Sequence, residues 1–251
     1  EIIGSIALLE APKGMAKEAK QAASEILKAQ KNIKSVYQKI GSHEGKLRIQ
    51  KLKRVLGERG TITTHKENGI TLKLDVAKVY FSPRQATERK RVYEQVKKPE
   101  RVLVMFSGIG PFAIAMAKNT PAVQVYGVEL NKTSHKYAVE NARINKVEAK
   151  TKLFCGDVRK IVPKLGKFDR LLMPLPKGAE RFLDVAFAAA KKGCIMHFYD
   201  FEKEEDIPQK AIGKITTAAA KSKRKIRTLN VVKCGQLAPR AYRVCVDFLV
   251  N

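Results

Sequence analysis

The chain has 251 residues, 44% of them hydrophobic, which is enough for one large domain or two modest ones around a buried core. Its 50 Lys and Arg residues outnumber 24 Asp and Glu residues. The resulting net charge of +26 favours a polyanionic partner, with a generally Lys-rich surface as the alternative. The first 98 residues carry +12 and the remainder +14, so the charge is not confined to one basic tail. Trp is absent, which argues against a large base-stacking platform.

The sequence carries no signal for a membrane span or for a cysteine framework. It contains no run of about 18 apolar residues and no signal-peptide pattern at its N-terminus. The four cysteines are scattered, without a Cys-x-x-Cys pair: Cys155, Cys194, Cys234 and Cys245. We therefore expect reduced thiols, no zinc site and a cytoplasmic location.

Residues 1–80 have the pattern of a small α+β domain. Helical spacing with Lys on the outer face predicts a helix at Lys13–Ala29. The predicted strands are Ile2–Leu9, Ile33–Tyr37, Gly45–Ile49, Ile62–His65 and Ile70–Leu74. Between the last two, Asn68-Gly69 is a strong hairpin signal because both residue types tolerate positive φ.

Residues 81–98 are predicted to form a connecting helix, with Ser82 as its candidate cap and Pro83 at its first position. From Arg101 onward strands alternate with helices, which predicts a parallel sheet covered on both faces. The predicted strands are Val102–Met105, Val123–Val128, Lys152–Cys155, Arg170–Met173 and Gly193–Tyr199. The predicted helices include Lys132–Asn145, Gly178–Ala190 and one after Ile207 that carries the basic cluster Lys221–Arg227.

The chain ends in two predicted strands, Arg227–Cys234 and Ala241–Val250. Their short connection predicts an antiparallel pair at one edge of the sheet. A mostly parallel sheet with such a terminal hairpin is typical of Rossmann-like class I methyltransferases rather than of dehydrogenases. We therefore predict an α/β fold in which residues 99–251 bind a cofactor and residues 1–80 form a smaller α+β domain.

The stretch after the first parallel strand is the most informative in the chain. The apolar run Val102–Met105 stops at the small turn Phe106–Gly110, and an apolar helical pattern follows. A glycine turn at this place lets the backbone approach a nucleotide-like ligand closely. Glu129 ends the second strand 21 positions after Gly108, close to the spacing at which an acid binds ribose hydroxyls.

Two later stretches fall at strand ends, where open α/β sheets bind ligands. Asp157 follows the third strand and is placed to accept a hydrogen bond from an adenine amino group or to cap the next helix. Met173–Lys177, with Pro174 and Pro176, follows the fourth strand. It is either a rigid part of the site or an ordinary connection.

Arg84 and Glu88 are spaced i, i+4, which would place both on one helix face. They form either a surface salt bridge or a pair in which Arg84 orients a substrate and Glu88 removes a proton. Three histidines have no metal-ligand spacing and are interpreted as structural, the last as a core residue: His65, His135 and His197.

Six stretches together resemble the tRNA (guanine-37-N1) methyltransferase family of archaea and eukaryotes. They are Thr64–Gly69, Lys78–Arg84 with Glu88, Met105–Phe112, Gly156–Arg159, Met196–Tyr199 and Ala238–Arg240. The resemblance covers essentially the whole chain. It implies a class I methyltransferase fold, S-adenosylmethionine as cofactor, the tRNA anticodon loop as partner, a monomeric state and a first domain that positions the RNA. The target base must leave its stack to enter such a pocket.

The resemblance also implies roles for individual residues. Glu88 matches the general base that takes the guanine N1 proton, and Arg48 matches an arginine that stabilises charge on the guanine O6. Arg84 matches a residue that shapes the substrate pocket. The implied cofactor contacts are Tyr80, Phe106, Ser107, Gly108, Gly110, Glu129, Leu130, Asp157, Val158, Pro174 and Pro176.

Two positions depart from the family pattern, which usually has Asp in place of Val104 and Asn in place of Pro174. Some archaeal relatives with such changes also methylate a wyosine intermediate, so the prediction includes that substrate. Two alternatives remain open. One is a wybutosine-pathway aminocarboxypropyl transferase that uses the same cofactor, and the other is an RNA-binding protein that kept the fold and lost catalysis.

Overall fold

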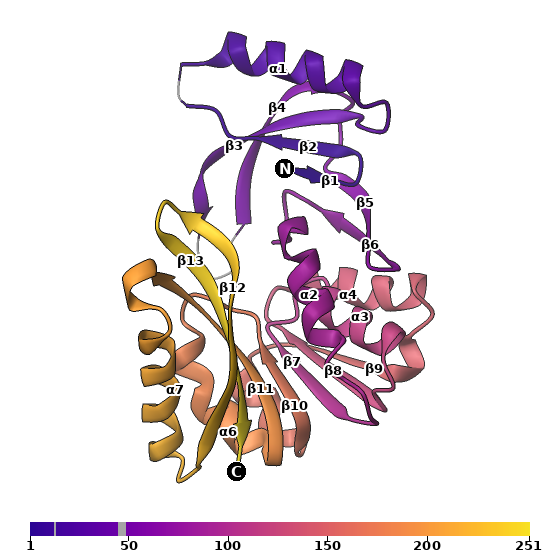
Figure 1. Ribbon diagram of the computed structural model, residues 1–251. Helices are drawn as coiled ribbons and strands as arrows, with labels where there is room; N and C mark the ends of the chain where they lie inside the picture. Colours follow the sequence, from indigo (N-terminus) through magenta and orange to yellow (C-terminus); the bar gives the residue numbers. More distant parts are fainter. Residues whose placement is uncertain (13, 45–48) are drawn as a thin grey trace.

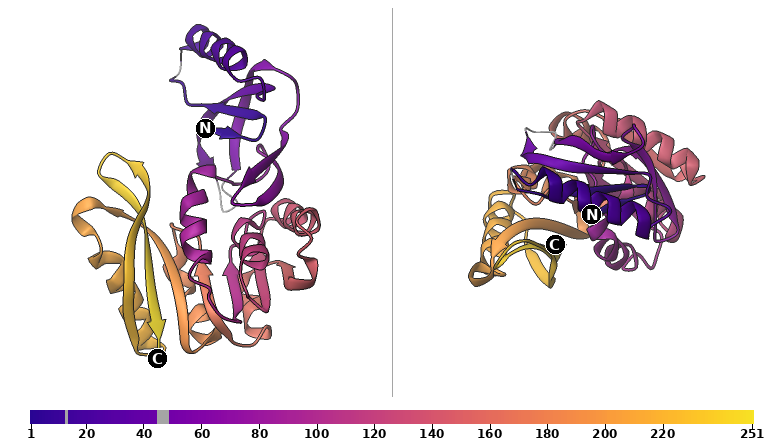
Figure 2. Two further views of the ribbon diagram at one scale, coloured as in Figure 1. Left: turned by 45° about the vertical axis from the view of Figure 1, so that its right-hand side comes forward. Right: turned by 90° about the horizontal axis from the view of Figure 1, so that it is seen from above.

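The computed structural model describes residues 1–12, 14–44 and 49–251, which form three β-sheets. The two larger sheets lie one above the other in Figures 1 and 2. The hairpin of β5 (Ile62–Glu67) and β6 (Ile70–Asp75) lies between them. Asn68 and Gly69 both have positive φ in its turn, as predicted for this dipeptide.

The N-terminal sheet has the strand order β1-β2-β3-β4. Its strands are β1 (Ile2–Ile3), β2 (Ile6–Leu9), β3 (Ser35–Glu44) and β4 (Ile49–Gly57). The single strand predicted at Ile2–Leu9 is instead a hairpin, because Gly4 adopts a φ of +56° and turns the chain between β1 and β2. The strand predicted at Gly45–Ile49 falls almost wholly outside the described residues.

Helix α1 (Ala16–Ala29) connects the parallel strands β2 and β3 and covers the N-terminal sheet (Figure 1). Its buried Ala23 packs with Ile33 and Val36 in a small core of its own, while Lys17 and Lys20 are exposed. This is the amphipathic arrangement that the sequence pattern predicted.

The C-terminal sheet has seven strands in the order β12-β13-β11-β10-β7-β8-β9. Its strands are β7 (Arg101–Met105), β8 (Gln124–Glu129), β9 (Thr151–Cys155), β10 (Phe168–Met173), β11 (Ala190–Lys203), β12 (Ile226–Ala238) and β13 (Ala241–Val250). The helices around it are α2 (Ala86–Tyr93), α3 (Pro111–Asn119), α4 (Lys132–Ile144), α5 (Val158–Ile161), α6 (Leu183–Ala189) and α7 (Gln209–Lys221). The five strands β7 to β11 run parallel to one another. Strands β12 and β13 form the predicted antiparallel hairpin at the edge of the sheet.

Successive residues of β7 face two different cores. Val102 and Val104 belong to the core that includes residues of α2 and α3, whereas Leu103 and Met105 belong to the core beneath α6 and α7. Side chains alternate along a strand, so a strand buried on both faces must be apolar throughout. This requirement explains why the unbroken apolar run in the sequence marked a central parallel strand.

The β5–β6 hairpin is hydrogen-bonded to helix α4 of the C-terminal sheet. The side-chain amide of Asn141 accepts from the Lys73 N–H at 2.7 Å and donates to the Lys73 carbonyl at 3.0 Å. The side-chain amide of Asn145 likewise accepts from the Thr71 N–H at 2.9 Å and donates to the Thr71 carbonyl at 2.6 Å. The two amides thus replace a neighbouring strand for β6. The domain division at residue 80 stays a prediction.

Two predicted helices differ from those observed. The connecting segment begins with a 3-10 turn (Pro83–Gln85) before α2, and Ser82 forms no side-chain cap bond. Helix α7 ends at Lys221, so the basic cluster that follows lies in a turn and in the start of β12. Among the described residues, no helix is long and apolar enough to cross a membrane.

Replacing Asn141 by Ala should lower the free energy of unfolding by about 3 kcal/mol, because it leaves buried backbone groups of β6 without partners. Chemical denaturation measures this loss. Asn119→Ala is the control, since Asn119 is exposed and donates one hydrogen bond to the Asn68 carbonyl. Its loss should stay below about 1 kcal/mol, and equal losses in both variants would contradict the role given to Asn141.

Candidate active site

The candidate site lies where the C-terminal sheet reverses its direction of growth. From β7 the sheet extends through β8 and β9 on one side and through β10 and β11 on the other. A crevice opens outside the carboxyl ends of the strands at such a point, and ligands of open α/β sheets bind there. Phe106, Glu129, Gly156 and Pro174 lie at the carboxyl ends of β7, β8, β9 and β10, respectively.

The turn after β7 brings the backbone close to this crevice. Phe106, Gly108 and Gly110 have φ angles of +60°, +57° and +88°. The Gly108 N–H donates to the Glu129 carboxylate at 2.7 Å, which pins the turn to the end of β8. Positive φ costs a non-glycine residue conformational energy, so the glycines serve this geometry.

Glu129 is the acid that the sequence placed at the tip of the second parallel strand. It accepts backbone N–H groups from Gly108 and Asn131, each at 2.7 Å. Burial raises the pKa of its carboxyl, although the backbone donors act in the opposite direction. Asn131 caps α4 by accepting from Thr133 and Ser134. The acid is thereby held at the place where ribose hydroxyls bind in related folds.

A cavity of about 440 Å³, here called the cofactor cavity, opens between these strand ends. Its lining includes eight of the predicted cofactor residues: Tyr80, Phe106, Gly108, Glu129, Leu130, Asp157, Val158 and Pro174. The wall is completed by Ser134, Gly156, Leu175, Lys177, Gly178, Arg181 and Phe182. Arg181 and Phe182 were not predicted. Phe182 packs edge-on against Phe106, with ring centroids 5.0 Å apart.

This lining fits an adenosine-containing cofactor. A Cβ on Gly108 would meet no protein atom within 4 Å, so the bare glycine leaves open space beside the turn. Asp157 caps α5 by accepting from the Arg159 N–H at 2.8 Å and also lines the cavity, so its two predicted roles are compatible. Glu129 and Asp157 thus offer acceptors at two strand ends, and aromatic surface lies beside them.

Two further hollows continue from the cofactor cavity. A recess of about 80 Å³ shares Tyr80, Phe106, Gly108 and Pro174 with it. The rest of the recess is formed by Phe81, Ser82, Gln85, Arg89, Ser107, Pro111, Phe112, Pro176, Tyr199 and Arg243. A hollow of about 330 Å³, here called the outer chamber, follows between the N-terminal sheet and the β12–β13 hairpin. The predicted contacts Ser107 and Pro176 therefore line the recess rather than the cofactor cavity.

Glu88, the predicted general base, is buried on α2 with 4% of its surface exposed. Its carboxylate accepts two hydrogen bonds from Arg91, at 2.7 and 2.8 Å, and one from the Tyr199 hydroxyl at 2.7 Å. The predicted placement of Arg84 and Glu88 on one helix face is wrong, because Arg84 lies on the 3-10 turn before α2 and lines the outer chamber. The roles of the two residues toward a substrate stay predictions. Tyr199 lines the recess and connects it to Glu88.

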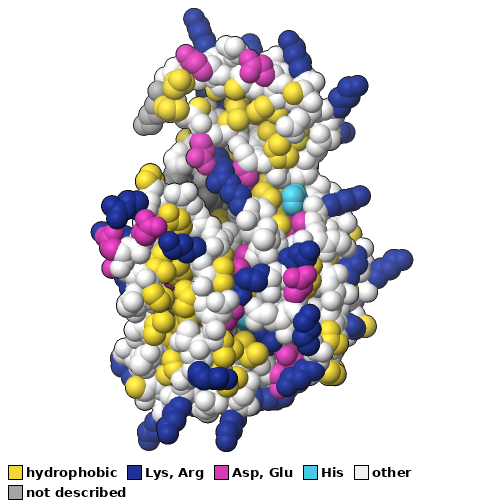
Figure 3. Space-filling view, viewed as in Figure 1, with side chains coloured by type: hydrophobic (Ala, Val, Ile, Leu, Met, Phe, Trp, Pro, Cys, Tyr) yellow, Lys and Arg dark blue, Asp and Glu magenta, His cyan; other side chains and the backbone are white. Residues whose placement is uncertain are grey.

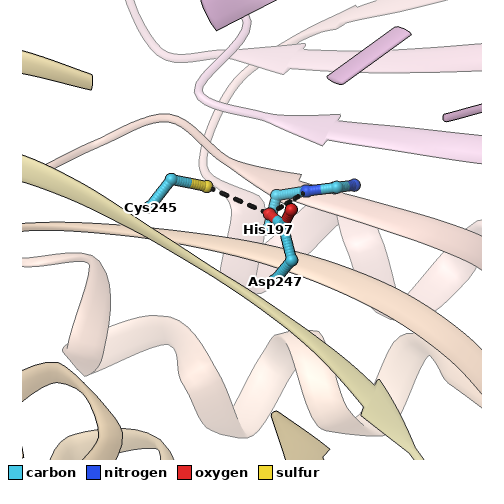
Figure 4. Close-up of side chains that lie close together, drawn as sticks. All are labelled: His197, Cys245 and Asp247. Atoms are coloured by element: carbon cyan, nitrogen blue, oxygen red, sulfur yellow. Dashed lines mark hydrogen bonds and ion pairs between the residues drawn. The ribbon is translucent and has the colours of Figure 1, made fainter. Parts of the chain in front are cut away.

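Arg91 also binds Asp247, which is the centre of the buried cluster in Figure 4. Asp247 lies 2.5 Å from Arg91 and 2.6 Å from the His197 Nδ1. Burial acts to raise the pKa of Asp247, but its bonds to His197 and Arg91 lower it overall. Burial lowers the pKa of His197, and its Nε2 lies 2.8 Å from Arg170. A neutral ring that accepts from Arg170 and donates to Asp247 satisfies both contacts.

This cluster is poorly suited to a metal ion, although ligand atoms of His197, Cys245 and Asp247 lie within 4.8 Å of one another. Both ring nitrogens of His197 are occupied, and the Arg91 guanidinium already binds Asp247. Burial raises the pKa of the Cys245 thiol well above its usual value, so the neutral thiol donates to Asp247. The prediction that His197 is a core residue with satisfied hydrogen bonds is confirmed.

Four positions singled out in the sequence have different outcomes. Arg48 lies outside the described residues, so its contact with the base stays a prediction. Gly110 does not line the cofactor cavity, the recess or the outer chamber, and it caps α3, where a Cβ would meet Ile114 at 2.9 Å. Val104 is fully buried in the core, and Pro174 lines both cavity and recess without an N–H to donate.

These features define the protein as a class I methyltransferase: a parallel sheet with a terminal antiparallel hairpin, a glycine turn after its first strand and an acid at the tip of the second. The chain matches the TRM5/TYW2 methyltransferase domain over residues 63–227, and it belongs to this family. The cofactor of the family is S-adenosylmethionine.

Several relatives match over nearly the whole chain. The tRNA (guanine(37)-N(1))-methyltransferase Trm5b of Pyrococcus abyssi is 41% identical over 100% of this chain and 74% of its own, and its crystal structure superposes with a TM-score of 0.91. The tRNA (guanine(37)-N(1))/4-demethylwyosine(37)-methyltransferase Taw22 of Nanoarchaeum equitans is 32% identical over 98% of both chains. A complex of aTrm5 with tRNALeu has a TM-score of 0.90 at 31% identity, covering 100% of this chain and 71% of that one.

Replacing Gly108 by Ala should weaken S-adenosylmethionine binding at least tenfold, equivalent to about 1.4 kcal/mol, because the added methyl group enters the space beside the turn. Isothermal titration calorimetry measures the dissociation constant. Gly193→Ala is a matched control, since Gly193 also has positive φ and no atom within 4 Å of an added Cβ, but lies outside the three hollows. Equal weakening in both variants would contradict the assignment of Gly108.

Replacing Asp247 by Asn should lower the free energy of unfolding by about 3 kcal/mol, because it removes a buried carboxylate and leaves the half-buried cation of Arg91 undercompensated. Thermal and chemical denaturation measure the loss. Asp206→Asn is the control, since Asp206 pairs with Lys210 at 3.8 Å on the surface. That pair should be worth less than about 1 kcal/mol. A small loss in the Asp247 variant would show that the cluster does not hold α2 to the sheet.

Proposed function

We propose that this protein transfers a methyl group from S-adenosylmethionine to N1 of guanosine 37 in tRNA, acting as a cytoplasmic monomer on the anticodon loop. The observation that carries the proposal is the adjacency of three elements. The cofactor cavity opens into the recess, and Tyr199 of the recess donates a hydrogen bond to Glu88. A base in the recess would therefore lie between the methyl donor and a buried carboxylate.

S-adenosylmethionine supplies an electrophilic methyl group when bound in the cofactor cavity. Guanine N1 carries a proton at neutral pH, which has to leave as the new bond forms. The two hydrogen bonds from Arg91 orient the Glu88 carboxylate, which is the proposed proton acceptor. In this arrangement the N1 proton passes to the Tyr199 oxygen while the Tyr199 proton passes to Glu88, so charge and protons balance.

The surface chemistry suits an RNA partner. Figure 3 shows Lys and Arg side chains over both the upper and the lower part of the molecule. Arg84 is exposed at the outer chamber, with no ion-pair partner among the described residues, and is available to a phosphate. Such contacts hold an RNA strand without reading its sequence. The base must then be identified inside the recess.

Methylation of a wyosine intermediate is a second candidate. The relative from Nanoarchaeum equitans is named for both substrates, and it matches over 98% of both chains. Pro174 supports this candidate because it leaves one wall of the recess without an amide donor. Transfer of labelled methyl to tRNA bearing 4-demethylwyosine at position 37 tests it, and absence of label there would restrict the enzyme to guanosine.

Replacing Glu88 by Gln should lower the single-turnover methylation rate on a G37 transcript by about 100-fold or more, with little change in tRNA affinity. Glu94→Gln is the control, since Glu94 follows the same helix but is exposed. Radiolabel transfer and a binding assay give the two quantities, and a thermal melt checks that the variant folds. Equal losses of rate and affinity would contradict a base role.

The same assay separates the competing reactions. A transcript with A37 should remain unlabelled. The expected by-product is S-adenosylhomocysteine, whereas methylthioadenosine would identify an aminocarboxypropyl transferase. Failure of calorimetry to detect S-adenosylmethionine binding would favour an RNA-binding protein without catalysis.

A further inference from the structure

Arg243 of β13 lies in the wall that separates the recess from the outer chamber, and it lines both. Its Nη2 donates to the Tyr80 hydroxyl at 3.3 Å. Its guanidinium lies 5.3 Å from the centroid of Phe201, the residue that pairs with it across β11 and β13. A hydroxyl and an aromatic face therefore orient this cation beside the space where the substrate base would sit.

Arg243 differs from the other arginines of the interior. Arg89 pairs with Glu67, Arg91 with Glu88 and Asp247, and Arg170 with Glu100, as the ion-pair distances of 2.5 to 2.7 Å show. No carboxylate of the described residues lies within 4.0 Å of Arg243. Its Nε is buried without a hydrogen-bond partner.

A partly buried cation without a counter-charge is costly, because it loses hydration and gains little in return. An unpaired buried N–H adds to that cost. Proteins keep such groups where a ligand completes their bonding. The position of Arg243 at the recess points to the substrate nucleotide as that ligand.

We propose that Arg243 reads the target guanine by donating hydrogen bonds to its O6 and N7, an inference that rests on the proposed methyl transfer to guanosine. The planar guanidinium carries five N–H donors, and its fork matches these two acceptors. Adenine presents an amino group at the position of O6, so the same fork opposes it. The contact lies on the Hoogsteen edge, which adjoins the Watson–Crick face at O6, and leaves N1 accessible to Tyr199 and Glu88.

Two other polar side chains of the recess, Tyr199 and Arg89, have hydrogen bonds to protein groups. The Tyr199 hydroxyl donates to Glu88, and Arg89 donates to Glu67 and to the Ser82 carbonyl. Pro174 has no N–H to offer the base. Among the described residues of this wall, Arg243 is thus the cation whose donors remain available for base recognition.

The test compares methylation of two tRNAs that differ in one atom group, guanosine or 7-deazaguanosine at position 37. The second base lacks the N7 acceptor but keeps N1 and O6. Wild-type protein should methylate the 7-deaza substrate about tenfold more slowly in single turnovers. In Arg243→Gln the rate on guanosine should fall and the two substrates should react at equal rates, because the contact to N7 is already absent.

Two further variants keep the comparison interpretable. Arg243→Lys retains the charge but lacks the fork, so its discrimination between the two bases should fall to less than half that of wild type. Arg227→Gln is the matched control, since Arg227 is exposed near the opposite end of the same hairpin. It should keep the tenfold ratio. Thermal melts establish that each variant is folded.

The outcomes are distinct. A ratio that persists in Arg243→Gln would overturn the proposal, as would a wild-type protein indifferent to N7. If Arg243 contacts a phosphate instead, its replacement should weaken tRNA binding and reduce the salt dependence of binding by about one counterion, with the ratio intact. A wild-type protein that fails to methylate the guanosine substrate would instead contradict the proposed function itself.

Discussion

The site depends on a chain of hydrogen-bonded polar side chains, most of them buried, that crosses the C-terminal sheet. Successive hydrogen bonds join six side chains in this order: Glu88, Arg91, Asp247, His197, Arg170 and Glu100. Each member satisfies the next, which is the condition under which buried ionic groups are tolerated. Because the members come from α2, β13, β11, β10 and the segment before β7, the chain holds α2 in one position on the sheet. The position of α2 in turn fixes where Glu88 and the residues before α2 lie in the site.

This arrangement also explains how a strongly basic protein keeps a stable interior. Carboxylates are scarce in this chain, with 24 against 50 basic residues. Several of them are buried against the interior arginines, such as Glu67 with Arg89 and Glu100 with Arg170. The surface is left with the excess of cations seen in Figure 3. Attraction for RNA and internal order are thus supplied by different arginines.

The sequence predicted the fold well because its signals are local. Three features each depend on a few neighbouring residues: the alternation of β7 side chains between two cores, the glycine turn and the Asn68-Gly69 hairpin. The prediction that Arg84 and Glu88 share one helix face was wrong for a physical reason. The i, i+4 rule holds within one α-helix, whereas the structure has a 3-10 turn from Pro83 to Gln85, which leaves Arg84 outside α2.

Residues of the site that come together only through tertiary structure were not predicted. Tyr199 and Arg243 lie on strands that become neighbours of the turn after β7 only when the sheet forms, and Phe182 is on a connection before α6. A weak signal existed for the first two. Each carries a polar group next to an apolar neighbour, Phe198 or Val244, and in a buried strand such a group requires a specific partner.

The amides of Asn141 and Asn145 have a consequence for how this protein is divided. Because they bind β6 to α4, the hairpin of residues 62–75 is attached to the cofactor-binding sheet, although it lies before residue 80 in the chain. The covalent joint between the two bodies is therefore the segment of residues 58–61. The match to the TRM5/TYW2 methyltransferase domain starts at residue 63, next to that joint, so it includes the hairpin and leaves the N-terminal sheet outside.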